Sequence, residues 1–270
     1  MITIYDMPSG YNEAFLPEAS AQWREIRYFS NVSGTYRRAN VILPEGYDTE
    51  KRYPVLYLLH GIGGDQNEWK VAKAEVISAN LVQEKKAAEM IIVLVNARVR
   101  REDQVPKADM FTIEHFRAFD AFREDLTQCL MPYMETYFPV SKGREHTALA
   151  GLSMGGRTAL YIGLTMTDLF GYIGAFSPAF GLLPYTNNGV TEEGLLGESG
   201  LCLPKEHAED TLVMIVHGTS DVVVRDEPVR YHEALERNGS KHVFYLVEGG
   251  HDFTVWSNAL YLFLGSVFGG

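Results

Sequence analysis

The sequence has few cysteines, and their spacing excludes two classes of small-protein scaffold. Cys129 and Cys202 are the only cysteines among 270 residues, and they lie far apart without a CxxC pattern. A disulfide framework and a zinc site both need several closely spaced cysteines, so neither is indicated and we expect no metal. Cys129 falls on the apolar face of an amphipathic segment, where we expect it to be buried.

Basic residues are also scarce. Lysine and arginine total 24 against 35 aspartates and glutamates, which gives a formal net charge of −11. A field of this sign opposes binding to nucleic-acid phosphates and to anionic lipid. No apolar run approaches the roughly 20 residues that span a bilayer. We therefore expect a soluble protein without a nucleic-acid or membrane partner.

The amino-terminal stretch lacks the features of a secretory signal. It reads MITIYDMPSGYNEAF and has neither a basic first region nor an apolar core. We expect a cytoplasmic protein, or a secreted one if a mature chain has been placed behind a new Met1.

Apolar material is plentiful, at 46% hydrophobic and 12% aromatic residues. Short apolar runs alternate with longer amphipathic segments, which is typical of an α/β fold with a mostly parallel central sheet and helices on both faces. We interpret residues 1–270 as a single domain. The expected buried strands are 55–60, 90–96, 147–152, 172–177, 212–218 and 242–249.

Other segments complete the expected architecture. Residues 23–31 and 35–44 alternate in polarity around Gly34 and predict an antiparallel hairpin at the sheet edge. Residues 121–138 predict a helix kinked at Pro132. The stretch 177–210 has no strong periodicity, so we expect a lid-like insert or binding loop there, with helices that the pattern does not reveal as the alternative. The remaining expected helices are 153–166, 228–239 and 252–268.

The stretch LAGLSMGGRTAL contains a GxSxG motif between an expected strand and an expected helix. A serine hydroxyl is a weak nucleophile and must project from a sharp turn toward a base, with small residues at Gly151 and Gly155 to avoid clashes. Ser153 is the candidate nucleophile. The alternative is a glycine-rich turn with Ser153 as a helix N-cap, and the motif alone leaves both interpretations open.

An acid and a base follow in the order typical of α/β-hydrolases. Asp221 comes just after an expected strand, on the same sheet edge as Ser153, whereas its rival Asp226 lies nearer the next helix, where capping is the commoner role. His251 follows the last strand behind Gly249 and Gly250, and is the candidate base. We interpret His217 as a structural hydrogen-bonding residue and place five further histidines at surface or loop positions: His115, His146, His207, His232 and His242.

An oxyanion hole needs two converging backbone N–H groups. The stretch HGIGGDQNEW follows an expected strand and indicates Ile62 as one donor, and Met154, next to the nucleophile, is the other. We expect His60 to brace the loop through a hydrogen bond. Trp69 is a candidate for the pocket mouth, with a buried packing role as the alternative.

These stretches together resemble the esterase D-like α/β-hydrolase family, and most closely the feruloyl (cinnamoyl) esterases of the carbohydrate esterase 1 type. The resemblance rests on YPVLYLLHGIGGDQNEW, FREDLTQCLMPYMETYFPV, ALAGLSMGGRTALYIGLT and YIGAFSPA. It implies an α/β-hydrolase fold, no cofactor, and hydrolysis of hydroxycinnamate esters of plant cell-wall arabinoxylan. The family's nucleophile, acid and base fall on Ser153, Asp221 and His251, and its oxyanion amides on Ile62 and Met154.

The expected partner is therefore a small-molecule or oligosaccharide ester. We expect substrate choice to rest on the 177–210 insert and on residues 99–116, whose Phe111 and Phe116 are candidates for holding an aromatic acyl group. The alternative within the family is a thioesterase resembling S-formylglutathione hydrolase, or an acyltransferase. A catalytically silent hydrolase-fold binding protein is the alternative from another class. The oligomeric state is not indicated by the sequence.

Overall fold

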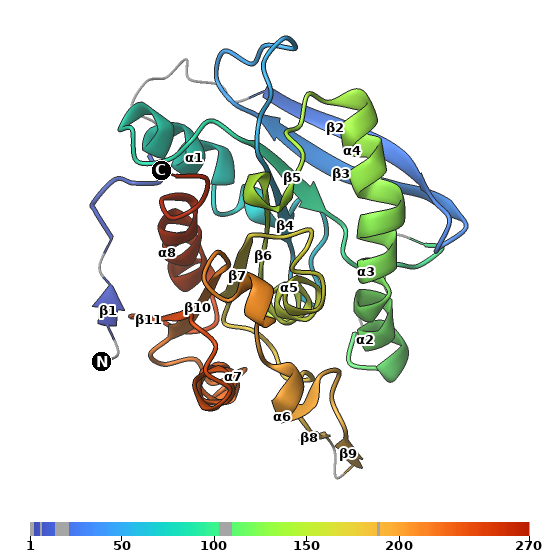
Figure 1. The fold of residues 1–270 in the computed structure, drawn as a ribbon, viewed down its shortest axis with the longest axis vertical. Helices are drawn as coiled ribbons and strands as arrows, with labels where there is room; N and C mark the ends of the chain where they lie inside the picture. The colour runs from blue at the N-terminus through green and yellow to red at the C-terminus, as the bar shows by residue number, and fades with distance from the viewer. Residues whose placement is uncertain (1–2, 6, 14–21, 103–109, 188–189, 270) are drawn as a thin grey trace.

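A nine-stranded sheet forms the centre of the computed structural model, which describes residues 3–5, 7–13, 22–102, 110–187 and 190–269 (Figure 1). Its strand order is β1-β11-β10-β7-β6-β4-β5-β3-β2. All six expected strands are present and pair in parallel with one another. They are β4 (Val55–Leu59), β5 (Ile91–Val95), β6 (Thr147–Leu152), β7 (Tyr172–Phe176), β10 (Leu212–Gly218) and β11 (Val243–Val247).

The two sheet edges are built differently. The predicted hairpin is confirmed: β2 (Gln22–Ser30) and β3 (Thr35–Leu43) pair antiparallel, and β3 continues antiparallel to β5. Gly34 in the connecting turn has a φ of +69°, which glycine adopts without strain. At the opposite edge, β1 (Thr3–Tyr5) pairs in parallel with β11. The sequence did not predict β1.

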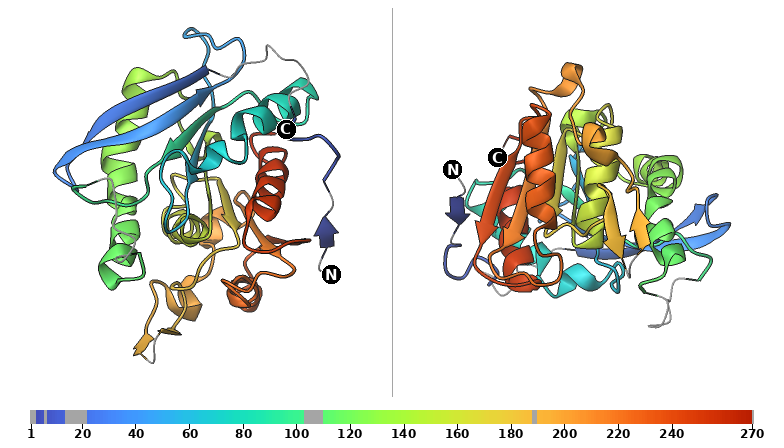
Figure 2. Two further views of the ribbon diagram at one scale, coloured as in Figure 1. Left: turned by 180° about the vertical axis from the view of Figure 1, so that it is seen from behind. Right: turned by 90° about the horizontal axis from the view of Figure 1, so that it is seen from below.

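Helices cover both faces of the sheet, as predicted (Figures 1 and 2). Successive side chains of a strand point to opposite faces, so Leu56 and Leu58 of β4 pack on one side while Tyr57 packs on the other. The first side carries α1 (Ala74–Gln83) and α8 (Phe253–Leu264). The second carries α2 (Ile113–Asp120), α3 (Phe122–Asp125), α4 (Met131–Tyr137), α5 (Met154–Thr165) and α7 (Glu227–Arg237).

The helix expected over 121–138 is interrupted by a π-helical turn, η3 (Leu126–Leu130), between α3 and α4. Pro132 lies in the first turn of α4, directly after this interruption. Proline has no N–H to donate and crowds the carbonyl four residues earlier, so a locally widened helix accommodates it. Cys129 is 7% exposed, which confirms its predicted burial.

The 177–210 stretch contains short elements of regular structure that its weak periodicity did not locate. It contains β8 (Tyr185–Asn187), β9 (Val190–Glu192), α6 (Gly197–Gly200) and the short 3-10 turn η5 (Lys205–His207). Leu182, Leu183 and Leu201 are buried in the core beside α5 and α7, so this stretch is partly core and not only a loop over it. The β8–β9 hairpin and α6 project from the body at the bottom of Figure 1.

Two further 3-10 turns are η1 (Glu68–Lys70) and η4 (Arg144–His146). Among the helices that the structure describes, none has the length and apolar character needed to cross a bilayer.

Candidate active site

Three side chains from separate strand ends meet at the carboxyl edge of the sheet. Ser153 follows β6, Asp221 follows β10 and His251 follows β11. The Ser153 hydroxyl lies 2.9 Å from Nε2 of His251, and Nδ1 of His251 lies 2.7 Å from Oδ2 of Asp221. The structure therefore joins the three residues that the sequence selected into one hydrogen-bonded chain.

The backbone at Ser153 is strained. Its φ is +53° and its ψ is −118°, a conformation that residues with a Cβ rarely adopt. The neighbouring glycines are required by space, since a Cβ at Gly151 would lie 2.6 Å from the Gly155 carbonyl carbon, and one at Gly155 would lie 2.5 Å from the His60 carbonyl oxygen. Ser153 precedes α5 but its side chain makes no capping bond, so the N-cap interpretation is wrong.

Asp221 is held by its own loop. Its Oδ1 accepts hydrogen bonds from the N–H groups of Val223, at 2.9 Å, and Val224, at 3.2 Å. Burial alone raises the pKa of the Asp221 carboxyl, but hydrogen bonding to His251, the charge of that ring and the two N–H donors outweigh it and hold the pKa below its ordinary value. Asp226 is the N-cap residue of α7, and the hydrogen bond to His251 is made by Asp221.

These partners fix the tautomer of His251. A carboxylate only accepts hydrogen bonds, so Nδ1 carries the ring proton and donates a hydrogen bond to Asp221. Nε2 is then free to accept a hydrogen bond from the Ser153 hydroxyl. The ring also packs edge-on against Trp256, with centroids 5.0 Å apart. This arrangement suits a general base that takes the serine proton.

Other histidines differ from expectation. His217 was expected to make a structural hydrogen bond, but its buried Nδ1 has no partner among the described residues. Burial lowers the pKa of this ring. His115 was expected at the surface or in a loop and is instead fully buried on α2. Burial depends on tertiary packing, which a single polar residue in a sequence does not reveal.

The loop after β4 presents the predicted oxyanion donor Ile62. Ala97 donates its N–H to Nε2 of His60 at 2.9 Å, so the His60 proton sits on Nδ1 and is donated to the Gly61 carbonyl at 2.6 Å. His60 thus braces the loop, as predicted. Because N–H and C=O point in opposite directions across a trans peptide, this bond directs the Ile62 N–H away from His60. Among the described residues, neither Ile62 nor Met154 has a hydrogen-bond acceptor for its N–H.

Side chains that the sequence analysis missed hold the same loop from other sides. Glu68 accepts the Gly61 N–H at 2.6 Å, the Arg98 guanidinium donates to the Gly64 carbonyl, and His115 Nε2 donates to the Ile62 carbonyl at 2.8 Å. Burial raises the pKa of Glu68. Glu68 lies within the HGIGGDQNEW stretch that was already singled out, whereas nothing in the sequence marks Arg98 or His115.

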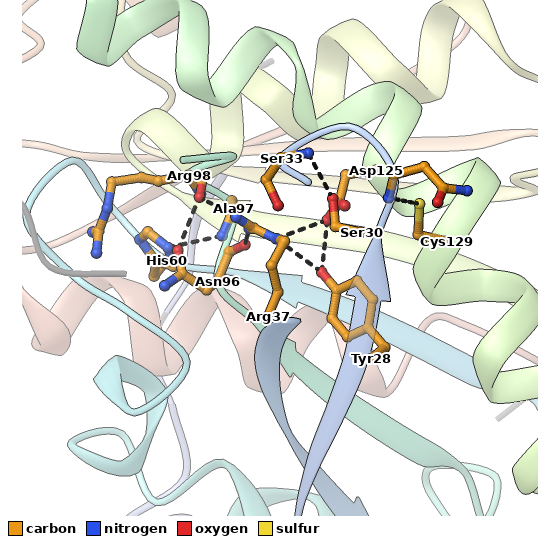
Figure 3. A network of polar contacts seen from close by, with 11 residues as sticks. Tyr28, Ser30, Ser33, Arg37, His60, Asn96, Ala97, Arg98, Asp125 and Cys129 are labelled. Atoms are coloured by element: carbon orange, nitrogen blue, oxygen red, sulfur yellow. Dashed lines mark hydrogen bonds and ion pairs between the residues drawn. The ribbon is translucent and has the colours of Figure 1, made fainter. Parts of the chain in front are cut away.

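A buried ion pair supports the chain segment that contacts His60 (Figure 3). Arg37 and Asp125 are both fully buried, 3.0 Å apart, and Tyr28 donates its hydroxyl to Asp125 at 2.6 Å. The Arg37 guanidinium also donates to the carbonyls of Asn96 and Arg98. These two residues flank Ala97, whose N–H is bound by His60, so the edge hairpin is linked to the loop after β4 that bears Ile62.

The structure corrects one predicted pocket residue. Trp69 is 1% exposed, donates its Nε1–H to the Leu59 carbonyl and packs against Phe176 and Phe253, so its assignment to the pocket mouth is wrong. Phe111 is 70% exposed, whereas Phe116 is buried and stacks on the half-buried ring of Phe180, with centroids 5.6 Å apart.

In the part of the chain that the structure describes, no group of three or more acidic, histidine or cysteine residues is placed to hold a metal ion. The arrangement at the sheet edge instead joins a hydroxyl, an imidazole and a carboxylate in one hydrogen-bonded chain, and the N–H groups of Ile62 and Met154 have no acceptor among the described residues. These are the components of acyl transfer through a covalent intermediate.

Comparison with known proteins agrees with this chemistry. The family named Esterase, described as "Putative esterase", matches residues 30–265. The chain belongs to the Esterase family. This assignment and the similar solved structures make it a carboxylic ester hydrolase, and its fold is that of the α/β-hydrolases.

Individual relatives are feruloyl esterases. The structure of a CE1 ferulic acid esterase from Anaeromyces mucronatus, in complex with ferulic acid, is 37% identical, covers 100% of this esterase and 99% of that chain, and has a TM-score of 0.91. An endo-1,4-beta-xylanase/feruloyl esterase of Xylanibacter ruminicola is 28% identical over 88% of this chain. The chain spans only 30% of that protein and 15% of endo-1,4-beta-xylanase Y from Acetivibrio thermocellus, so it corresponds to a part of these curated relatives.

Proposed function

We propose that this esterase is a serine feruloyl (cinnamoyl) esterase that releases hydroxycinnamates from plant cell-wall arabinoxylan esters, with Ser153, His251 and Asp221 as its catalytic triad. The observation that carries the mechanism is the continuous hydrogen-bonded chain from Asp221 through His251 to a serine with positive φ. The substrate class is supported by the likeness to the ferulic acid esterase from Anaeromyces mucronatus.

Acylation follows from the geometry. As the Ser153 oxygen attacks the ester carbonyl carbon, His251 Nε2 takes the hydroxyl proton and Asp221 stabilises the imidazolium that forms. The carbonyl oxygen becomes an oxyanion and accepts hydrogen bonds from Ile62 and Met154. The bond to the sugar oxygen then breaks, His251 returns the proton to that oxygen, and a feruloyl-serine ester remains.

Deacylation repeats the same steps with water as the nucleophile. His251 takes a proton from water, the hydroxide oxygen attacks the acyl carbon, and the oxyanion hole is used again. The bond to the Ser153 oxygen breaks, the proton returns to that oxygen, and ferulic acid leaves and loses its carboxyl proton to solvent. No cofactor is required by this sequence of steps.

The aromatic acyl group is proposed to lie beside Phe180. Ala179 donates its N–H to the Ser153 carbonyl at 3.0 Å, which places the next residue, Phe180, close to the nucleophile. The Phe180 ring is half-buried and contacts the rings of Phe116 and Tyr185. Phe111, whose ring is exposed, stays a candidate for a contact with the acyl group.

A hydrolysis profile tests the proposal. We expect methyl ferulate and methyl sinapate to be cleaved with higher kcat/KM than naphthyl acetate, and S-formylglutathione to be cleaved poorly. A preference for S-formylglutathione would replace the substrate class with thioesters. No turnover of any substrate by a folded sample, together with no labelling of Ser153 by a fluorophosphonate, would indicate a silent binding protein instead.

A further inference from the structure

His115 makes a direct contact with the proposed oxyanion donor residue. It lies on α2, far from Ile62 in sequence, and its side chain is fully buried. Its Nε2 is 2.8 Å from the Ile62 carbonyl oxygen. A carbonyl oxygen can only accept a hydrogen bond, so Nε2 carries a proton and donates it.

The two peptide groups on either side of Ile62 are therefore each held by a different histidine. His60 binds the Gly61 carbonyl, which belongs to the peptide whose N–H is that of Ile62, and His115 binds the carbonyl of the following peptide. Rotating either peptide plane would break one of these hydrogen bonds. The direction of the Ile62 N–H is thus fixed from both sides, and the two imidazoles flank the ring of Phe119 at 5.5 and 5.6 Å.

The helix that carries His115 is also tied to the nucleophile. Asp120, at the end of α2, forms an ion pair with the buried Arg157 of α5 at 2.5 Å. The backbone N–H of Arg157 in turn donates to the Ser153 carbonyl at 3.0 Å. This chain of contacts sets the distance between the element that bears His115 and the turn that bears Ser153.

We propose that His115 is a positioning residue that aims the Ile62 N–H at the oxyanion formed on Ser153 attack. It acts through Ile62 and does not contact the substrate. The inference rests on the proposed function, since it requires Ile62 to be an oxyanion donor. Loss of one oxyanion donor lowers kcat by about 10²–10³-fold, and a misdirected donor lowers it by part of that factor.

Two amide substitutions test the role, of which His115→Gln stays close to histidine in volume. In His115→Gln the side-chain amide nitrogen occupies nearly the position of Nε2 and can still donate to the Ile62 carbonyl, whereas the shorter amide of His115→Asn cannot reach it. The variants are compared by steady-state kinetics on 4-nitrophenyl acetate. Hydrolysis of this substrate depends on serine esterase activity but not on specificity for feruloyl esters. We expect His115→Gln to keep kcat within about threefold, and His115→Asn to lose at least about tenfold in kcat with KM within twofold.

A matched control separates positioning from helix stability. Ala118→Gly lies on the same helix, destabilises it and leaves His115 intact, so it should lower Tm without a comparable loss of kcat. Equal kcat values for His115→Gln and His115→Asn would overturn the role of His115. A kcat loss in Ala118→Gly as large as that in His115→Asn would also overturn it. Failure of both His115 variants to fold would show a packing residue and would overturn it as well.

Failure of the proposed function is recognised separately. Wild-type protein that does not hydrolyse 4-nitrophenyl acetate would refute a serine esterase, whereas active wild-type protein with indistinguishable His115 variants would refute only the positioning role.

Discussion

At the residue scale, Asp221 and Asp226 offer a direct test of the proposed acid. Asp221→Asn should lower kcat/KM by roughly 10³–10⁴-fold, because the amide no longer holds the required tautomer of His251 while the nucleophile stays in place. Asp226→Asn, at the N-cap of α7, should stay within about twofold of wild type. Kinetics on methyl ferulate measure both variants, and the reverse order of losses would assign the acid to Asp226.

The strained backbone at Ser153 predicts a stability difference between two inactive variants. Glycine adopts the observed φ of +53° more readily than alanine, so Ser153→Gly should have a free energy of unfolding about 1 kcal/mol higher than Ser153→Ala. Urea titration of the two proteins measures this difference. A less stable glycine variant would show that the turn is not strained.

His60 predicts a pH dependence of stability. Burial and the charge of Arg98 lower the pKa of its ring to about 3, whereas an unfolded histidine titrates near 6.5. Between these values the unfolded chain binds one more proton than the folded chain, so the free energy of unfolding falls as the pH is lowered through this window, by up to about 1.4 kcal/mol per unit.

Replacement of His60 removes this contribution. Between about pH 4 and 6, the slope of unfolding free energy against pH should be smaller in His60→Gln than in wild type, by the amount that corresponds to about one proton. Urea titrations at several pH values provide the slopes. Identical slopes for wild type and His60→Gln would contradict a buried neutral imidazole.

Sequence patterns could select Ser153, Asp221 and His251 because each follows an apolar run and has a defined chemical role. The same patterns could not place Trp69, His115 or His217, because burial and partner choice depend on segments distant in the chain. Glu68 and Arg98 were missed because their partners are backbone groups, which every residue has, so no sequence pattern marks the pairing.

At the element scale, the buried Arg37–Asp125 pair joins the edge hairpin to α3 and to the segment after β5. Arg37→Met should lower the free energy of unfolding by about 3–5 kcal/mol, since it leaves Asp125 buried without its cation. The double variant Arg37→Met/Asp125→Leu should recover part of this loss.

Chemical denaturation measures these variants. Tyr28→Phe is a control that leaves both charges in place; it removes the hydroxyl that donates to Asp125 and accepts from Arg37, and should cost about 1–2 kcal/mol. An Arg37→Met protein within about 1 kcal/mol of wild type would contradict the structural role of the pair.

Elements differed in how well the sequence predicted them. Continuous apolar runs of five to seven residues gave the six central strands, because both faces of a parallel sheet are covered. β1 was missed because it has only three residues, and α2 because its polar residues mask a short apolar face. The π-helical turn before Pro132 replaced the expected kink, since a local widening satisfies the same steric constraint.

At the scale of the whole molecule, the sheet topology explains why distant residues form one site. Six neighbouring parallel strands end at the same edge, and the loops after four of them bear His60, Ser153, Asp221 and His251. The order of strands in the sheet could not be predicted from the chain alone, but the edge shared by parallel strands could. The single domain over residues 1–270 and the cytoplasmic location stay predictions.

The most direct test of the account compares methyl ferulate hydrolysis by wild type and Ser153→Ala under identical conditions, with circular dichroism to show that both are folded. We predict that wild type releases ferulate at a measurable steady-state rate and that Ser153→Ala is slower by at least about 10⁴-fold. Release of ferulate by the variant at a rate comparable to wild type would contradict the assignment of Ser153 as the nucleophile, and a wild type without activity would contradict the proposed function.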